Sequence, residues 1–338
     1  MTDMLPGRVL PCICALLMCW THACALAAEP AFATLEKMGR GVNILGYDGI
    51  WEGGRDAPFK PKYFGMIQDA GFRHVRINLY AFRFMDARNV LSAQMLESLD
   101  WVIEQSVRHG LVPVLDEHDF EICQTDRPTC EAKLTAFWTQ ISARYAGRHP
   151  QLVFELLNEP GGSMTAEWWN DFYPRLLAIV RASSPARTVI IPALNTENPY
   201  EVHRLLLPET DRNIIVTVHY YKPMRFTHQG APWAEEFRGK AGMDWGSPTD
   251  EQQVAQDLSI INAWARAMRR PIYLGEFGVY DAAPPAARTR YLSFIARTAG
   301  SHGWSWAYWQ LTHDFNLIDT SADKWKLEIL QALLGPRS

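Results

Sequence analysis

Short apolar runs alternate with longer segments of helical periodicity along most of the chain, and this alternation restricts the possible folds more than any other feature. Strand-like runs occupy residues 40–45, 72–79, 111–115, 152–157, 188–192, 214–219, 271–276 and 303–310. Apolar residues recur every three or four positions in the segments that follow these runs, at 63–70, 93–109, 133–146, 166–182, 200–207, 251–269, 286–298 and 323–334. Strands that alternate with helices in this way predict an α/β protein with a single closed (β/α)8 barrel, the TIM-barrel architecture, over residues 29–338.

A doubly wound open sheet is the alternative fold for such an alternation. That fold often carries a glycine-rich phosphate-binding loop after its first strand. Residues 46–51 instead have the sequence Gly-Tyr-Asp-Gly-Ile-Trp. No stretch rich in proline, glycine or serine divides the chain into two domains. We therefore predict the closed barrel.

The first 28 residues differ from the rest of the chain. Arg8 precedes a largely apolar stretch that begins at Val9 and closes with Ala-Leu-Ala-Ala, a small-residue pattern that signal peptidase cleaves. We interpret residues 1–28 as a secretory signal peptide, cut after Ala27 or Ala28, and expect a secreted or periplasmic protein. A retained membrane anchor is the alternative, because the apolar stretch is nearly long enough to span a bilayer.

Two cysteines remain once the signal peptide is removed. The other four, Cys12, Cys14, Cys19 and Cys24, lie within it. Cys123 and Cys130 flank the polar stretch 124–129, so in an exported protein they indicate one disulfide bond that pins a loop. A metal site is a weaker interpretation because no second cysteine pair accompanies them.

The charge of the chain excludes several classes of partner. The formal net charge is −4 over 338 residues, and no run of lysine and arginine occurs. Nucleic acid and anionic membrane surfaces are therefore poor candidate partners. We expect a monomer that needs no cofactor and makes no membrane contact after signal cleavage.

Two of the apolar runs end in a carboxylate. The fourth run continues to Asn158, Glu159 and Pro160, and the proline ends the strand because it has no N–H to donate. The seventh run ends in Gly-Glu-Phe-Gly and presents Glu276 in the same way. Two carboxylates, each presented at a strand end, are what hydrolysis of a glycosidic bond requires.

Polar residues of equal parity share one face of a strand, because side chains alternate between the two faces. In the run 72–79, for example, the polar residues alternate with valine, isoleucine and leucine. Across four runs the polar positions of one parity are His74, Arg76, Asn78, Asp116, His118, Glu155, Glu159, Thr217, His219 and Tyr221. A barrel interior that served packing alone would be filled mainly by Val, Ile and Leu. A polar interior near the strand C-terminal ends therefore predicts an enzyme.

Position along the strand distinguishes the members of this polar set. Glu155 lies deeper in the barrel than Glu159, and we interpret it as an interior carboxylate satisfied by a neighbour. Glu117 and Asp119 flank His118 and together suggest a metal site. Adjacent residues on a strand point to opposite faces, however, so we expect no catalytic metal.

These motifs, in this order, resemble glycoside hydrolase family 5, the cellulase-type retaining glycosidases, over essentially the whole mature chain. The matching positions are Arg76 in His-Val-Arg-Ile, His118 in Leu-Asp-Glu-His, the Asn-Glu-Pro signature at 158–160, His219 and Tyr221 in His-Tyr-Tyr, Glu276 in Gly-Glu-Phe-Gly, and Trp309 in Trp-Ala-Tyr-Trp. The chain departs from the family pattern at Asn78, where many members have proline, and around Asp48, where Asn-Trp or a similar pair is common. Both departures leave the details of substrate binding open.

The resemblance implies a double displacement. Glu276 would attack the anomeric carbon, and Glu159 would act first as the acid and then as the base, with the two carboxyl groups about 5–5.5 Å apart. Arg76 and Tyr221 would hold the nucleophile ionised. The negative charge of Glu276 would then raise the pKa of Glu159.

The resemblance also implies substrate-binding roles for four other residues. Asn158 would hold the sugar 2-hydroxyl, and His118 and His219 would orient the sugar and the acid. Trp309 would offer an apolar face on which a pyranose ring stacks.

The substrate that the resemblance favours is a β-1,4-glucan such as cellulose or carboxymethylcellulose, because residues 226–233 resemble bacterial endoglucanases. β-Mannan, xyloglucan and mixed-linkage β-glucan are alternatives on the same core. A barrel that binds carbohydrate without catalysis is an alternative of a different class. The intact pair Glu159 and Glu276 argues against it, and no separate carbohydrate-binding module or linker is visible.

Overall fold

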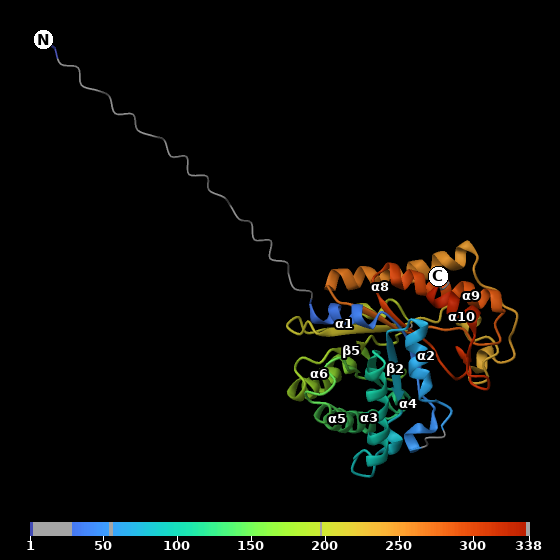
Figure 1. Ribbon diagram of the computed structural model, residues 1–338, viewed down its shortest axis with the longest axis horizontal. Helices are drawn as coiled ribbons and strands as arrows, with labels where there is room; N and C mark the ends of the chain where they lie inside the picture. Colours follow the sequence, from blue (N-terminus) through green and yellow to red (C-terminus); the bar gives the residue numbers. More distant parts are fainter. Residues whose placement is uncertain (3–28, 54–56, 197, 336–338) are drawn as a thin grey trace.

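The computed structural model describes residues 1–2, 29–53, 57–196 and 198–335. Over these residues, eight parallel strands pair in chain order and close into a barrel, in which β1 pairs with both β2 and β8 (Figure 1). The strands are β1 (Arg40–Ile44), β2 (His74–Leu79), β3 (Val112–Glu117), β4 (Val153–Glu155), β5 (Val189–Pro192), β6 (Ile214–His219), β7 (Ile272–Glu276) and β8 (Ser305–Tyr308). The predicted (β/α)8 barrel is confirmed. The predicted signal peptide lies outside the described residues apart from its first two positions.

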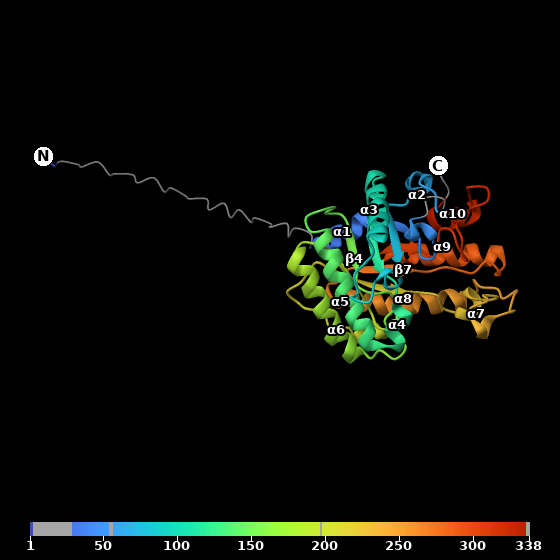
Figure 2. The ribbon, with the colours of Figure 1, turned by 90° about the horizontal axis from the view of Figure 1, so that it is seen from below.

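Helices surround the barrel, with α5 and α6 on one side and α8 and α9 on the other (Figure 2). The α-helices are α1 (Pro30–Met38), α2 (Lys62–Ala70), α3 (Ala93–Arg108), α4 (Phe120–Thr125), α5 (Arg127–Arg144), α6 (Ala166–Ser183), α7 (Met224–Thr227), α8 (Pro248–Met268), α9 (Pro285–Ser301) and α10 (Leu327–Leu334). Short 3₁₀ helices are η1 (Gly49–Glu52), η2 (Phe82–Phe84), η3 (Glu201–Arg204) and η4 (Glu235–Phe237), and a small hairpin is formed by β9 (Ile318–Asp319) and β10 (Lys324–Trp325). Within the described part of the chain, none of these helices combines the length and the apolar character that crossing a bilayer requires.

Three predicted helices differ from the structure. The segment predicted at 200–207 contains only the 3₁₀ helix η3, because Pro208 disfavours helical backbone at the residue before it. The helix predicted at 133–146 begins earlier, at Arg127, where Asp126 caps the helix by accepting a hydrogen bond from the backbone N–H of Thr129. The helix predicted at 323–334 begins at Leu327, since the preceding residues form the hairpin strand β10.

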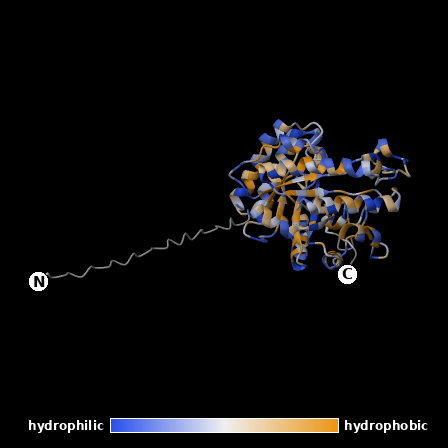
Figure 3. Cartoon of the chain, turned by 90° about the horizontal axis from the view of Figure 1, so that it is seen from above, coloured by the Kyte–Doolittle hydropathy of each residue, from blue (hydrophilic) through white to orange (hydrophobic). Residues whose placement is uncertain are grey.

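The main hydrophobic core lies between the barrel and the surrounding helices. Figure 3 shows hydrophobic residues concentrated in the strands and on the inner sides of the helices, with hydrophilic residues outside. In β2 the outward residues Val75, Ile77 and Leu79 belong to this core, as the alternation of residue types predicts. The alternate side chains of the same strand are therefore left for the barrel interior.

A second, smaller core fills the lower part of the barrel interior and is closed by α1. The apolar residues of α1 that enter it are Ala31, Leu35 and Met38. They pack with inward side chains of the strands, namely Val112, Val114, Val153, Ile190, Ile215, Tyr273 and Ala307. The predicted polar interior therefore lies mainly toward the C-terminal ends of the strands, and His74 is a buried polar residue near the apolar base that α1 supplies.

Cys123 and Cys130 are joined by a disulfide bond with an S–S distance of 2.01 Å. The predicted pairing is therefore present, but it connects two helices, α4 and α5, rather than pinning an irregular loop. Both sulfur-bearing residues are fully buried. The bond holds α4 against α5 directly after β3, at the end of the barrel where the predicted site residues lie.

Candidate active site

Glu276 and Glu159 lie close together at the C-terminal end of the barrel. Glu276 is the last residue of β7, and Glu159 follows the end of β4 in a left-handed backbone conformation with φ of 38°. This conformation is costly for a residue other than glycine and is often found at functional sites. One carboxylate oxygen of each residue lies within 4.8 Å of the other. This oxygen–oxygen spacing is compatible with the retaining geometry, in which the two carboxyl groups lie about 5–5.5 Å apart.

Arg76 lies at the centre of a buried hydrogen-bond network. Its Nε and Nη2 donate to Oε2 and Oε1 of Glu155, at 2.7 Å and 3.0 Å, and its Nη1 donates to Oε1 of Glu276 at 2.7 Å. Nη2 also donates to Oδ1 of Asn158 at 2.9 Å and lies 3.1 Å from Oδ2 of Asp116. The planar guanidinium group thereby fixes the positions of several functional groups from different strands.

Asp116 and Glu155 beside Arg76 are fully buried, and the charge of Arg76 opposes the effect of burial on the pKa of both carboxyl groups. Burial alone would raise the pKa of Asp116, but the charges of Arg76 and His118 lower it below its ordinary value. Burial raises the pKa of Glu155, and Arg76 opposes that rise only in part. Glu155 is therefore an interior carboxyl group satisfied by a neighbour, as predicted from its depth.

Tyr221 completes the environment of Glu276. Its hydroxyl donates to Oε2 of Glu276 at 3.0 Å, while Arg76 holds the other oxygen. Both oxygens of the carboxylate are thus oriented by donors, and the side chain is almost entirely buried. These contacts are the ones predicted for Arg76 and Tyr221.

His219 lies between the two glutamates. Its Nδ1 is 2.7 Å from Oε1 of Glu159 and 3.6 Å from Oε2 of Glu276. Burial opposes the charged imidazolium, but Glu276 and Glu159 raise the pKa of His219 above its ordinary value. Burial likewise raises the pKa of Glu159, and the hydrogen bond and charge of His219 lower it below its ordinary value.

The predicted direction of the pKa shift at Glu159 is therefore wrong for the unliganded protein. We expected the charge of Glu276 to raise it, but the imidazole of His219 is closer and stabilises the carboxylate form. His219 and Glu159 therefore share one hydrogen bond, of 2.7 Å, and each side chain can hold the proton in it. The two residues titrate as a pair.

His118 and Trp309 form a second group beside the glutamates. Their rings are parallel, with an interplanar angle of 9° and a centroid separation of 5.6 Å. The Nδ1 of His118 lies 2.5 Å from Oδ2 of Asp116, which connects this group to Arg76. The structure therefore brings all the predicted substrate-binding residues to one end of the barrel.

Three functional features were not predicted. Asn43 of β1 accepts a hydrogen bond from Nη1 of Arg76 at 2.9 Å and donates to the carbonyl of Gly275. A polar residue inside the first strand was the available signal for it.

Tyr47 and Tyr80 stack with ring centroids 5.2 Å apart near the ends of β1 and β2, and Tyr47 is 57% exposed. Two tyrosines within three residues of strand ends could have identified this pair.

α4 also borders the site. The side-chain amide of Gln124 donates to the backbone carbonyl of Glu159 at 3.4 Å, and the hydroxyl of Ser163 donates to the carbonyl of Gln124. Since Cys123 anchors α4 to α5, the disulfide bond supports the loop that carries Glu159. This contact could not be predicted from the cysteine spacing.

Glu117 and Asp119, the carboxyl residues that flank His118, contact each other and the backbone. Glu117 is fully buried, and Oδ2 of Asp119 accepts a hydrogen bond from the backbone N–H of Phe82. Burial raises the pKa of both carboxyl groups. Among the described residues, the histidine and carboxylate atoms close enough to share a metal ion are those of Glu159, His219 and Glu276. Arg76 and Tyr221 already donate hydrogen bonds to the two oxygens of Glu276. We therefore interpret Glu159, His219 and Glu276 as an acid–base site.

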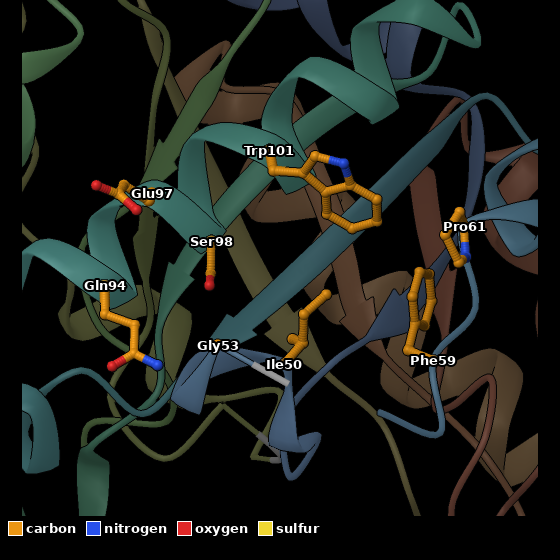
Figure 4. A pocket seen from close by; sticks show the side chains of 8 residues that line it. All are labelled: Ile50, Gly53, Phe59, Pro61, Gln94, Glu97, Ser98 and Trp101. Carbon is orange, nitrogen blue, oxygen red and sulfur yellow. The ribbon is translucent and has the colours of Figure 1, made fainter. Parts of the chain in front are cut away.

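A separate cavity of about 440 Å³ lies outside the barrel between η1 and α3 (Figure 4). Ile50 and Phe59 line one side of it, and Trp101 of α3 lies across from them. It contains none of the residues described above. We therefore place the chemistry at the barrel end and not in this cavity.

Comparison with known proteins agrees with this arrangement. A family model described as cellulase, glycosyl hydrolase family 5, matches residues 35–315. The crystal structure of endoglucanase Cel5A from Thermotoga maritima is 34% identical, with a TM-score of 0.84 over 90% of this chain and 100% of that chain. The cellulose synthase subunit Z of Clostridioides difficile is 30% identical, with a TM-score of 0.83 over 88% of this chain and 100% of that chain. The chain therefore belongs to the cellulase family, glycosyl hydrolase family 5.

Curated relatives are more distant in sequence. Endoglucanase H of Acetivibrio thermocellus is 27% identical over 92% of this chain, and the match covers 34% of that protein. Cellodextrinase A of Ruminococcus flavefaciens is 25% identical over 78% of this chain and 82% of its own length. The chain thus spans about a third of the first relative and most of the second.

Proposed function

We propose that this protein is a retaining endo-β-1,4-glucanase. The observation that carries the proposal is the pair Glu159 and Glu276, with carboxylate oxygens within 4.8 Å and with Arg76 and Tyr221 donating to Glu276. The names of the similar proteins support a glucan substrate, since they include an endo-β-1,4-glucanase solved in complex with its substrate at 29% identity. An acid and a nucleophile at this distance have no use in a barrel that only binds carbohydrate.

In the first step Glu276 attacks the anomeric carbon as the carboxylate. The bond to the leaving sugar breaks, and its oxygen takes the proton from Glu159. In the second step Glu159 accepts a proton from water, the water oxygen bonds to the anomeric carbon, and the ester to Glu276 breaks. Esterification removes the negative charge of Glu276, which favours the basic form of Glu159 at the step that needs it.

The remaining side chains bind and orient the sugar. Arg76 holds Oδ1 of Asn158, so the amide nitrogen faces away from the arginine and is oriented to donate to the 2-hydroxyl. Trp309 lies parallel to His118 and offers an apolar ring for stacking. Trp233, which is 49% exposed on the loop after β6, is a second exposed aromatic surface. These positions suit a polymer that passes across the barrel end.

β-Mannan is the second candidate substrate. Solved complexes of Thermotoga maritima Cel5A contain mannotriose in one case and cellobiose in another. Glucan and mannan differ in the orientation of the 2-hydroxyl, which is the group assigned to Asn158. We expect hydrolysis of β-1,4-glucan to be faster than hydrolysis of mannan.

The test uses the purified mature protein on carboxymethylcellulose, mixed-linkage β-glucan, xyloglucan and mannan. Reducing-sugar release should be greatest on a β-1,4-glucan, and NMR of early products should show the β-anomer. The Glu276→Ala variant should lose more than about 10³-fold in kcat. An α-anomeric first product, or full turnover by Glu276→Ala, would contradict the retaining assignment.

We further propose that the mature chain is exported and functions in an oxidising compartment. The leader-like pattern of residues 1–28 and the Cys123–Cys130 bond support this placement. Mass spectrometry of the protein from its native host would find a chain that starts at Ala28 or Glu29 and is two hydrogens lighter than the dithiol. An N-terminus at Met1 would contradict cleavage.

A further inference from the structure

Two buried polar atoms of β6 beside the active site have no hydrogen-bond partner in the structure. They are Nε2 of His219 and Oγ1 of Thr217. Thr217 is fully buried, and His219 is 1% exposed. A buried polar group without a partner is costly, and native proteins satisfy most such groups. Because Thr217 and His219 lie on the inward face of the same strand, β6, we infer one cause for both unpaired atoms.

Both atoms lie next to Gly275 of β7. A Cβ atom at Gly275 would be 2.6 Å from Oγ1 of Thr217 and 3.0 Å from Nε2 of His219. The two polar atoms therefore flank a single point and lie at most about 5.6 Å apart, the sum of these two distances, so one water molecule can bridge them, while a direct hydrogen bond requires the Thr217 side chain to rotate. A glycine is required here because any side chain would push them apart.

The strand pairing explains why Gly275 occupies this place. Thr217 pairs with Tyr273 and Val218 pairs with Leu274, but His219 pairs with Glu276. The register shift leaves Gly275 as an extra residue on β7, the feature of a β-bulge. The bulge places His219 opposite Glu276, the proposed nucleophile. The side-chain amide of Asn43 donates a hydrogen bond to the carbonyl of Gly275 at 2.9 Å.

We propose that Thr217 and Gly275 are positioning residues for proton delivery. The hydroxyl of Thr217 hydrogen-bonds Nε2 of His219, and Gly275 leaves the space for that contact. This inference rests on the proposed glycosidase function of the same site.

A hydroxyl suits this position because it can donate and accept. When His219 is an imidazolium, Nε2–H donates to Thr217; when the ring is neutral with the proton on Nδ1, Nε2 accepts from Thr217. His219 can therefore pass a proton to Glu159 through Nδ1, 2.7 Å away, and stay satisfied at Nε2 in both states. A carboxylate or an ammonium group at Thr217 would favour one state only.

The charged groups around His219 do not supply this contact. Glu159 and Glu276 face its Nδ1, and Arg76 and Glu155 interact with it through their charges from β2 and β4. Because these groups act from the Nδ1 side or at longer range, we assign the Nε2 side to Thr217. The hydroxyl therefore stabilises the imidazolium, to which a hydrogen bond is worth more than to a neutral ring.

The experiment compares Thr217→Val with Thr217→Ser. Valine removes the hydroxyl at nearly the same volume, and serine keeps it. In Thr217→Val we expect the alkaline limb of kcat/KM on β-glucan to move to lower pH by about one unit, because the imidazolium loses a charge-assisted hydrogen bond. Thr217→Ser should restore the wild-type limb. An unchanged limb in Thr217→Val would overturn the proposal.

A second substrate separates proton delivery from general damage to the site. 2,4-Dinitrophenyl β-cellobioside has a leaving group that needs no proton, so its kcat/KM should stay within about twofold of wild type in Thr217→Val. An equal loss on both substrates would show a merely structural role and would also overturn the proposal.

Gly275→Ala tests the space itself. The added methyl should displace His219 and lower kcat/KM on β-glucan more than on the dinitrophenyl substrate. Gly300→Ala is the matched control, because its Cβ would meet nothing within 4 Å and its backbone is not left-handed. Loss of the same size in both glycine variants would contradict the assigned role.

NMR titration of labelled histidine measures the effect without any turnover. The pKa of His219 should be lower in Thr217→Val than in wild type and in Thr217→Ser. If wild type hydrolyses no β-glycan, the proposed function fails, while this titration still decides whether Thr217 supports the imidazolium. An equal His219 pKa in wild type and Thr217→Val would overturn the inference by itself.

Discussion

At the scale of single residues, Arg76 organises the site. It is fully buried, and carboxylates of three other strands, Asp116, Glu155 and Glu276, lie within 3.1 Å of it. A buried cation with such partners is tolerated only while its hydrogen bonds are complete. The same contacts hold Glu276 and Asn158 in place, so stability and activity depend on one guanidinium group.

Replacing Arg76 should therefore affect both properties. We expect Arg76→Met to lower the free energy of unfolding by about 3–5 kcal/mol, because it leaves buried carboxylates without their cation. Arg76→Lys should recover part of the stability but little activity, since one ammonium group cannot make the forked contacts. Urea unfolding at pH 7 measures the first effect and kcat the second.

The control for this prediction is Arg175→Met. The side chain of Arg175 is 54% exposed and pairs with Glu131 on the surface, so its loss should cost less than about 1 kcal/mol. Equal destabilisation by the two methionine variants would refute the central role of Arg76.

At the scale of elements, α1 determines which part of the barrel interior is apolar. Ala31, Leu35 and Met38 enter the lower core, and the polar site lies at the opposite end of the strands. α1 precedes β1 and is therefore not part of the strand–helix repeat. Its function is to cover the N-terminal end of the barrel, which the sequence alternation does not reveal.

Leu35→Ala should destabilise the protein by about 2–5 kcal/mol, the usual cost of removing a buried leucine side chain. Turnover per folded molecule should be unchanged, because α1 and the glutamates lie at opposite barrel ends. Phe32→Ala, on the exposed side of the same helix at 39% exposure, should cost much less. Urea denaturation and kcat of the folded variants measure these effects, and a Phe32→Ala loss as large as that of Leu35→Ala would refute the buried role of Leu35.

At the scale of the whole molecule, buried ionisable groups set the pH range of stability. His74 is fully buried between the carbonyl of Met38 and the hydroxyl of Tyr273. Burial lowers the pKa of His74 to about 4 from its ordinary 6.5. The folded state therefore resists a proton that the unfolded state accepts, and stability is lost as the pH falls from about 6.5 towards 4.

His74→Gln should reduce this loss. Between pH 7 and pH 4 the free energy of unfolding of wild type should fall by up to about 3 kcal/mol more than that of the variant, which carries no titrating group. The variant will be less stable at pH 7, where its hydrogen bonds are weaker. The decisive quantity is the difference in slope, measured by urea unfolding at several pH values, and parallel pH profiles would contradict the prediction.

The sequence by itself determined the strands, their inward faces and the chemistry at their ends. Strand period and parity are local properties, so the inward positions of Arg76 and His118 and the strand-end position of Glu276 could be predicted from neighbouring residues. The pairing of Cys123 and Cys130 was predictable from the export signal and from their being the two cysteines left after its removal. Apolar periodicity alone could not distinguish the short η3 segment from a full helix, although Pro208 was a signal in the sequence that the helix ends early.

Only the tertiary structure decided the position of the groups that share a proton at the site. That position depends on Glu159, Glu276 and His219, which come from three different strands, and on distances of a few ångströms between them. The β-bulge at Gly275 and the closure of the barrel by α1 also depend on contacts between distant segments. Periodicity assigns each residue to a face, but the pKa of a carboxyl group depends on which neighbour is nearest, and folding alone determines that neighbour.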